Sequence, residues 1–167
     1  QWQFTSRLRF KLPMWKYLIP FLLLAALFGA EPAPNRIVRV VAVSQDGLNR
    51  SNPAILDDTL ERLERASAFR PDIAALPEVF VPGEPETVPG PVTRRLAEWA
   101  KRNGSYVLFG IRTRHDGRVY NSAVLLDRQG GVVGLYDKTH PTEGEMQEAV
   151  SPGKPGGGIF QTDFGTI

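Results

Sequence analysis

The chain has 167 residues, of which 42% are hydrophobic and 23% are charged, a composition that indicates one globular domain rather than a disordered or fibrous protein. Its formal net charge of +2 depends on four basic residues within positions 1–30, where no acid occurs; positions 31–167 hold 16 basic and 18 acidic groups. That balance excludes a cationic groove for nucleic acid, and the absence of cysteine excludes disulfides and thiolate metal sites within these residues.

Residues 1–30 are interpreted as a signal peptide or an N-terminal anchor, and residues 31–36 as a linker. A basic lead precedes an uncharged apolar run from Leu18 to Ala30, which is shorter than the roughly 20 residues that span a bilayer. The run fits the central region of a secretory signal. We therefore expect an exported protein, periplasmic or secreted, with a retained anchor as the alternative. Membrane contact is expected only through residues 15–30.

The remaining chain alternates between strand-like and helix-like patterns. Two helices are predicted, one opening at Asn52-Pro53 and one running from Pro91 to Asn103-Gly104. Short links at 115–118 and 128–130 have hairpin length. Five strands are predicted over Ile37–Ser44, Asp72–Leu76, Ser105–Arg114, Val119–Asp127 and Gly131–Tyr136, with a short strand at Ile159–Thr162. This order predicts an α/β fold with a mixed parallel and antiparallel sheet and helices on a sheet face.

Two strand ends carry the residues with the clearest chemical meaning. Lys138 follows the apolar run Gly131–Tyr136, and Glu145 comes seven residues later, in a loop that contains too much Pro and Gly for a helix. A lysine and a glutamate alone more often form an exposed ion pair. However, the predicted strand at Asp72–Leu76 also ends at a carboxylate, Glu78. Because α/β sheets assemble sites from the ends of different strands, we expect these groups to converge on one cleft.

Other polar residues give weaker signals. His115 and His140 have no metal-ligand spacing, and His115 is interpreted as a solvated turn residue. The glycine-rich stretch 154–158 lacks the Lys-Ser/Thr pair and the following helix of a phosphate loop, so it is interpreted as a turn. No nucleotide, metal or organic cofactor is expected.

Three motifs in this order resemble the nitrilase (carbon–nitrogen hydrolase) superfamily from about Ile37 to the end of the chain. The strand around Asn121, followed by a glycine turn, is also similar to this family. The motifs are Leu76-Pro77-Glu78-Val79-Phe80, then Tyr136-Asp137-Lys138-Thr139-His140, then Glu145 with Val150-Ser151-Pro152-Gly153 leading to Phe160-Gln161-Thr162-Asp163-Phe164-Gly165. The resemblance implies an α-β-β-α sandwich, incomplete here, over residues 37–167.

The resemblance further implies hydrolysis at an amide, carbamoyl or nitrile carbon by a Glu-Lys-Cys mechanism on a small-molecule substrate. Glu78 would be the general base, Lys138 would stabilise the oxyanion, and Glu145 would position the site, with Glu143 and Glu148 as alternatives to Glu145. The family's cysteine follows the Asp-Phe-Gly-x-Ile stretch, and this chain ends there, at Ile167. We therefore expect an N-terminal fragment, inactive alone, whose nucleophile lies beyond Ile167.

Two further functions stay open. An N-acyltransferase of the same superfamily would carry several membrane spans before the domain, whereas one short apolar run precedes it here. A non-catalytic secreted sandwich protein would lack the downstream cysteine. The substrate is not identified by these residues, although Glu84, Glu86 and Arg112–Arg114 are candidates for contacting it. The full-length protein could form a homo-oligomer, as family members often do.

Overall fold

The computed structural model describes residues 36–45, 54–81 and 83–167. The predicted signal peptide or anchor, nearly all of the linker, and the predicted helix start at Asn52-Pro53 lie outside the described residues. Within the described ranges, no helix combines the length and the hydropathy needed to cross a bilayer.

A mixed sheet forms the centre of the fold, with its five strands in the same order in space as in the chain. The first three strands are parallel, and the last three are antiparallel. The strands are β1 (Val40–Ala42), β2 (Ile73–Ala75), β3 (Tyr106–His115), β4 (Arg118–Leu126) and β5 (Val132–Asp137). The predicted α/β architecture is therefore confirmed, although β1 and β2 are shorter than their apolar runs predicted.

Two helices connect the parallel strands. Helix α2 (Ile55–Ala66), extended by the 3-10 turn η2 (Ser67–Phe69), links β1 to β2, and α3 (Pro91–Asn103) links β2 to β3. Helix α3 has the predicted ends: Pro91 lies in its first turn and Gly104 closes it at φ +57°. Its start is capped by Glu86, whose carboxylate accepts hydrogen bonds from the backbone N–H groups of Val92 and Thr93 at 3.0 and 3.1 Å. Glu86, a predicted substrate contact, therefore acts as a helix cap.

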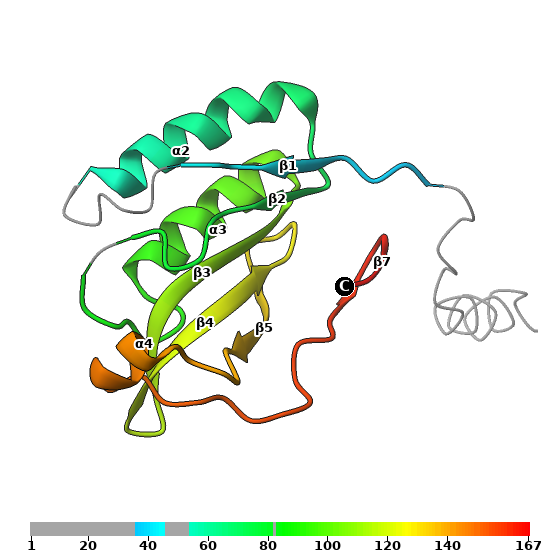
Figure 1. Cartoon of the computed structure of the whole chain (residues 1–167). Coiled ribbons are helices and arrows are strands. Elements are labelled where there is room, and N and C mark those ends of the chain that lie inside the picture. Colours follow the sequence, from blue (N-terminus) through cyan, green and yellow to red (C-terminus); the bar gives the residue numbers. More distant parts are fainter. Residues whose placement is uncertain (1–35, 46–53, 82) are drawn as a thin grey trace, which may run out of the picture. The chain divides into compact units, whose positions relative to one another are not determined.

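Helices α2 and α3 cover one face of the sheet, as Figure 1 shows. Alternate residues of β3 and β4 point toward them, so the apolar side chains on this face are removed from water. Trp99 of α3 and Leu63 of α2 are fully buried in this layer. The core on this face also includes Leu96, Val107, Phe109, Ile111, Val124 and Leu126.

The opposite face is covered only in part. Its apolar end, at Ile73, Tyr106 and Leu125, contacts Phe160 and Phe164 of the C-terminal segment, which Figure 1 shows on the side away from the helices. This segment forms a small hairpin of β6 (Gln161–Thr162) and β7 (Gly165–Thr166).

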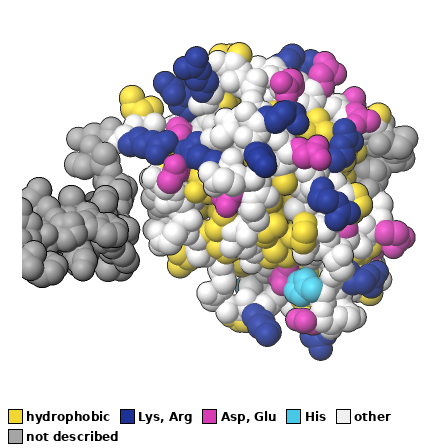
Figure 2. All heavy atoms as spheres, turned by 180° about the vertical axis from the view of Figure 1, so that it is seen from behind, with side chains coloured by type: hydrophobic (Ala, Val, Ile, Leu, Met, Phe, Trp, Pro, Cys, Tyr) yellow, Lys and Arg dark blue, Asp and Glu magenta, His cyan; other side chains and the backbone are white. Residues whose placement is uncertain are grey.

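Hydrophobic side chains also remain at the surface. Figure 2 shows such side chains gathered near the centre of one view of the molecule, with acidic and basic side chains around them. Exposed apolar residues include Ile37, Val40, Phe69 and Ile159. Apolar surface of this kind indicates contact with other polypeptide.

Two local predictions are wrong. The stretch after Lys138 contains a short helix, α4 (Glu143–Gln147), which starts with a capping box between Thr142 and Glu145. His115 is the last residue of β3 rather than a solvated turn residue. Its ring stacks on Tyr120 at 4.2 Å between centroids, and its Nε2 lies 3.2 Å from a carboxylate oxygen of Asp137.

Candidate active site

Glu78 lies just beyond β2, on a segment that runs close along β3. Gly110 makes this approach feasible, because a Cβ there would lie 2.8 Å from the Cα of Glu78. The next residue, Val79, has φ +42°, a conformation that β-branched residues rarely adopt. Strain of this kind concentrates at functional sites.

Lys138 and Glu145 reach Glu78 from the other side of the sheet. Lys138 immediately follows β5, and its backbone N–H donates to the carbonyl of Asn121 at 2.8 Å, which continues the β4–β5 pairing. Its Nζ lies 2.8 Å from Glu78 Oε1 and 3.0 Å from Glu145 Oε2. Glu145 is held in place by α4, because Oε2 also accepts the backbone N–H of Thr142 at 2.8 Å. The structure thus brings the three predicted residues together.

Asn121 completes the cluster and was not among the predicted site residues. Its side-chain amide donates to Glu78 Oε1 and to Glu145 Oε1, both at 2.6 Å. Asn121 is buried on β4 and faces the side of the sheet that the helices do not cover. A buried amide within an otherwise apolar strand was the available signal, because such a group requires polar partners.

The charges in this cluster are not balanced. Two carboxylates share one ammonium, and Glu78 is the exposed member, with 62% of its side-chain surface accessible against 12% for Glu145. Glu78 Oε1 accepts both printed contacts, from Lys138 and Asn121, whereas Oε2 has no hydrogen-bond partner among the described residues. One carboxylate oxygen is therefore free to accept a proton.

The pKa values follow from these contacts. The hydrogen bonds from Lys138 and Asn121 lower the pKa of Glu78 below its ordinary value, and the same bond to Glu78, with that to Glu145, raises the pKa of Lys138. Burial alone would raise the pKa of Glu145, but hydrogen bonds from Thr142, Asn121 and Lys138 outweigh it and bring that pKa to about 2. The cluster is therefore fully ionised at neutral pH.

The cluster opens into a solvent-accessible cavity of about 270 Å³, lined by Glu78, Asn121, Lys138 and Glu145 together with Arg112 and Glu148. Glu143, one alternative to Glu145, instead lies on the exposed side of α4 near Gln147. Glu148, the other, pairs with Arg112 at 2.7 Å. Of the three glutamates, only Glu145 contacts Lys138 in the described part of the chain.

Within the described ranges, no group of three or more His, Asp or Glu side chains has the arrangement of a metal site. His140 contacts its neighbour Thr139 at 2.9 Å. The cluster thus offers a free carboxylate oxygen, a fixed ammonium and a second carboxylate around one small cavity. This set can take up a proton and stabilise negative charge on an adjacent oxygen.

Comparison with solved structures shows the same fold in known amidases. The structure superimposes on an amidase from Nesterenkonia sp. with a TM-score of 0.62 and 18% sequence identity, covering 77% of this chain and 53% of that one. It superimposes on a carbon–nitrogen hydrolase from Helicobacter pylori, also with a TM-score of 0.62, at 17% identity, covering 76% of this chain and 48% of that one.

Sequence comparison leads to the same family. A hydrolase from Pseudomonas protegens encoded in the pqqF 5′ region is 32% identical over 130 residues, which are 66% of this chain and 46% of the relative. Nitrilase 1 of Arabidopsis thaliana is 24% identical over 137 residues, 66% of this chain and 40% of the relative. The chain thus spans less than half the length of these two relatives. The family description "carbon-nitrogen hydrolase" matches residues 37–167, and the chain therefore belongs to the carbon–nitrogen hydrolase family.

Proposed function

We propose that this chain supplies the Glu-Lys-Glu part of an active site that hydrolyses an amide, carbamoyl or nitrile carbon through a cysteine thiolate. The observation that carries the proposal is the contact of Lys138 Nζ with both Glu78 and Glu145, at 2.8 and 3.0 Å, beside a cavity. Glu78 and Lys138 are 60 residues apart in the chain, and Lys138 extends from the end of another strand. A surface ion pair does not require such convergence.

Glu78 is proposed as the general base. Its free Oε2 would take the proton of the thiol, and the thiolate would add to the carbonyl carbon of an amide. The protonated Glu78 would then give this proton to the leaving nitrogen, and the amine would depart as the carbonyl re-forms. In the second half of the reaction, Glu78 would remove a proton from water as the water attacks the thioester, which restores the thiol and releases the carboxylic acid.

Lys138 is proposed to stabilise the oxyanion that forms at each addition step. Its contacts with two carboxylates keep it protonated, and a fixed cation in a partly desolvated site lowers the energy of the tetrahedral intermediate. Lys138 also lowers the pKa of Glu78, which weakens Glu78 as a base while the two groups are paired. The reaction therefore requires Lys138 to turn toward the substrate oxygen as negative charge develops there.

Glu145 and Asn121 are proposed as positioning residues. Glu145 is tied to α4 by the Thr142 N–H, so it fixes Lys138 from a rigid helix start. The Asn121 amide holds the two carboxylates at one distance, despite their mutual repulsion. The nucleophile is proposed to come from polypeptide outside these 167 residues, which contain no cysteine. Solved structures of neighbouring amidases include cysteine-substituted forms, one of them, from Nesterenkonia, with butyramide.

The test is ammonia release from butyramide by the whole protein, with Glu78→Gln compared with the wild type. General-base catalysis contributes roughly 10²–10⁴-fold, so kcat should fall by about this factor. Glu143→Gln is the matched control, because Glu143 belongs to α4 and makes no contact with Lys138 within the described ranges. Equal turnover by wild type and Glu78→Gln would remove the base assignment. No turnover of butyramide or of other small amides and nitriles by the wild type would favour the non-catalytic alternative.

A further inference from the structure

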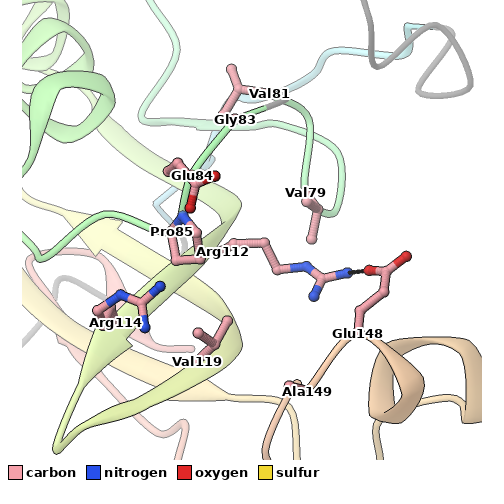
Figure 3. Close-up of a pocket in the computed structure, with 10 residues that line it drawn as sticks. All are labelled: Val79, Val81, Gly83, Glu84, Pro85, Arg112, Arg114, Val119, Glu148 and Ala149. Carbon is pink, nitrogen blue, oxygen red and sulfur yellow. Dashed lines mark hydrogen bonds and ion pairs between the residues drawn. The ribbon is translucent and has the colours of Figure 1, made fainter.

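A second cavity adjoins the cluster of Glu78, Lys138 and Glu145. It has a volume of about 550 Å³ and opens to solvent. Val79, Arg112 and Glu148 line both this cavity and the smaller one that contains the cluster. Figure 3 shows Arg112 and Glu148 extended toward each other, between the loop that carries Val79 and the segment after α4. A ligand with its reactive carbon near Lys138 would therefore place its remainder beside Arg112.

The walls of this second cavity combine apolar side chains with four charged ones. Val79, Val81 and Val119 supply much of the apolar wall. The charged groups are Arg112, Arg114, Glu84 and Glu148. Formal charges thus cancel overall, and the preference of the cavity depends on which of these groups already has a partner.

Arg112 has unused hydrogen-bonding capacity. Its side chain is only 14% exposed, and its Nη2 donates to Glu148 Oε2 at 2.7 Å. Its Nε is buried and has no hydrogen-bond partner among the described residues. Nε and Nη2 form one edge of the guanidinium, the edge that binds a carboxylate through two parallel hydrogen bonds. Glu148 uses only one of these donors, and its side chain is 66% exposed, so an incoming carboxylate can replace it.

Arg114 adds a second cation to the same cavity. It lies two residues beyond Arg112 on β3, so both side chains leave the same face of the sheet. No carboxylate of a described residue forms an ion pair with Arg114, whose backbone N–H is bound to the carbonyl of Glu86 at 2.9 Å. Glu84 lines the cavity as well, but it does not occupy either arginine in the described ranges.

We propose that this second cavity binds a carboxylate at the far end of the substrate, with Arg112 and Arg114 as the residues that hold it. The substrate class would then be monoamides or mononitriles of aliphatic dicarboxylic acids, with an apolar chain between the reactive carbon and the carboxylate. This inference rests on the proposed function for the identity of the reacting group. The carboxylate site itself depends only on the arginines and the cavity.

Calorimetric binding to the whole protein tests the site without relying on turnover. The two ligands are glutaramate, which carries a carboxylate, and pentanamide, a neutral amide with the same chain length. Glutaramate should bind more tightly than pentanamide. Because a hydrogen-bonded charged pair is involved, Arg112→Gln should weaken glutaramate binding by roughly 10–100-fold, and pentanamide binding by much less. Equal affinities of the two ligands for the wild type, or equal losses in Arg112→Gln, would overturn the proposal.

Two further variants separate binding from general damage. Glu148→Gln removes the competing carboxylate and should tighten glutaramate binding, a gain that a misfolded protein cannot produce. Arg65→Gln is the matched control, because Arg65 forms an exposed ion pair with Glu61 at 2.7 Å, the same distance as the Arg112–Glu148 pair. It should leave both affinities unchanged. Weaker glutaramate binding in Glu148→Gln would contradict the proposed displacement.

Turnover of the same two ligands distinguishes the two proposals. If glutaramate binds as expected but neither ligand releases ammonia, the proposed hydrolysis fails for this class and the carboxylate site stands. If pentanamide and glutaramate are hydrolysed with equal kcat/KM, the hydrolase assignment stands and the carboxylate site fails.

Discussion

The two ends of β2 each carry a charged cluster, and the two clusters are built differently. At the amino end, Asp72 is 11% exposed and accepts from Arg36 at 2.6 Å and Arg128 at 2.8 Å through Oδ1, and from the Arg39 backbone at 3.0 Å through Oδ2. Arg128 also pairs with Asp163 and lies over the ring of Tyr106 at 5.3 Å. Two cations face two carboxylates there, and both oxygens of Asp72 are used.

At the carboxyl end the corresponding balance is missing. Glu78 and Glu145 share the one ammonium of Lys138, and Glu78 keeps an oxygen without a partner among the described residues. The Asp72 cluster ties the C-terminal hairpin to the sheet, whereas the Glu78 cluster holds like charges together beside a cavity. Perturbed and incompletely satisfied charges of this kind are typical of functional sites. The comparison therefore predicts that Asp72 matters for stability and Lys138 for chemistry.

The largest effect is expected for Lys138→Met. Removing the ammonium leaves an oxyanion without its cation, and the loss of one such donor typically costs about 10²–10³ in kcat. The pKa of Glu78 should also rise, because its strongest lowering contact disappears. The measurement is kcat for amide hydrolysis by the whole protein, with the acid limb of its pH profile. A variant that keeps wild-type kcat would place the site elsewhere.

Asp72→Asn should destabilise the fold without comparable loss of kcat. It leaves Arg128 and Arg36 partly buried without their main carboxylate, and breaking a largely buried pair costs about 3 kcal/mol. Urea unfolding gives the free energy. Asp57→Asn is the control, because its ion pair with Arg95 at 2.7 Å is exposed and should contribute less than about 1 kcal/mol. Equal losses in the two variants would contradict the distinction between the clusters.

The pH dependence of stability tests Glu145. Its pKa is about 2 in the folded protein and near its ordinary value of 4.5 when unfolded. A depressed folded-state pKa contributes stability that is complete above the unfolded value and is lost as the pH falls toward the folded one. The free energy of unfolding should thus fall more steeply in wild type than in Glu145→Gln between about pH 5 and pH 2, by at most roughly 3 kcal/mol. Parallel curves would show that Glu145 is not held by these contacts.

Much of this arrangement could be predicted from local patterns. Alternating apolar residues predicted β3 and β4, and Pro91 with Gly104 predicted the ends of α3. The convergence of Glu78 and Lys138 followed from a general property of strand ends, and their ion pair confirms that they meet. Their catalytic roles stay predictions.

The failures concern features that depend on partners distant in sequence. The capping box of Thr142 and Glu145 was visible in the sequence, but Pro141 and Gly144 obscured the short helix α4. Asn121 looked like one more strand residue because its two carboxylate partners come from other elements. The position of His115 against Tyr120 and Asp137 depends on the register of β3 with β4 and on β5, which hairpin length alone does not determine.

The smallest effect is expected for Gly110→Ala, and it tests how the fold positions Glu78. The added Cβ would lie 2.8 Å from the Cα of Glu78 and from the backbone N of Val79, so the segment after β2 must move away from β3. Overpacking costs typically about 1–3 kcal/mol. The shift would also move the Glu78 carboxylate relative to Lys138 and lower kcat. Gly157→Ala is the control, since its Cβ would meet Tyr136 at an ordinary 3.8 Å. Because this clash is with backbone, a Gly110→Ala variant with wild-type stability and wild-type kcat would mean that the approach of this segment to β3 does not set the position of Glu78.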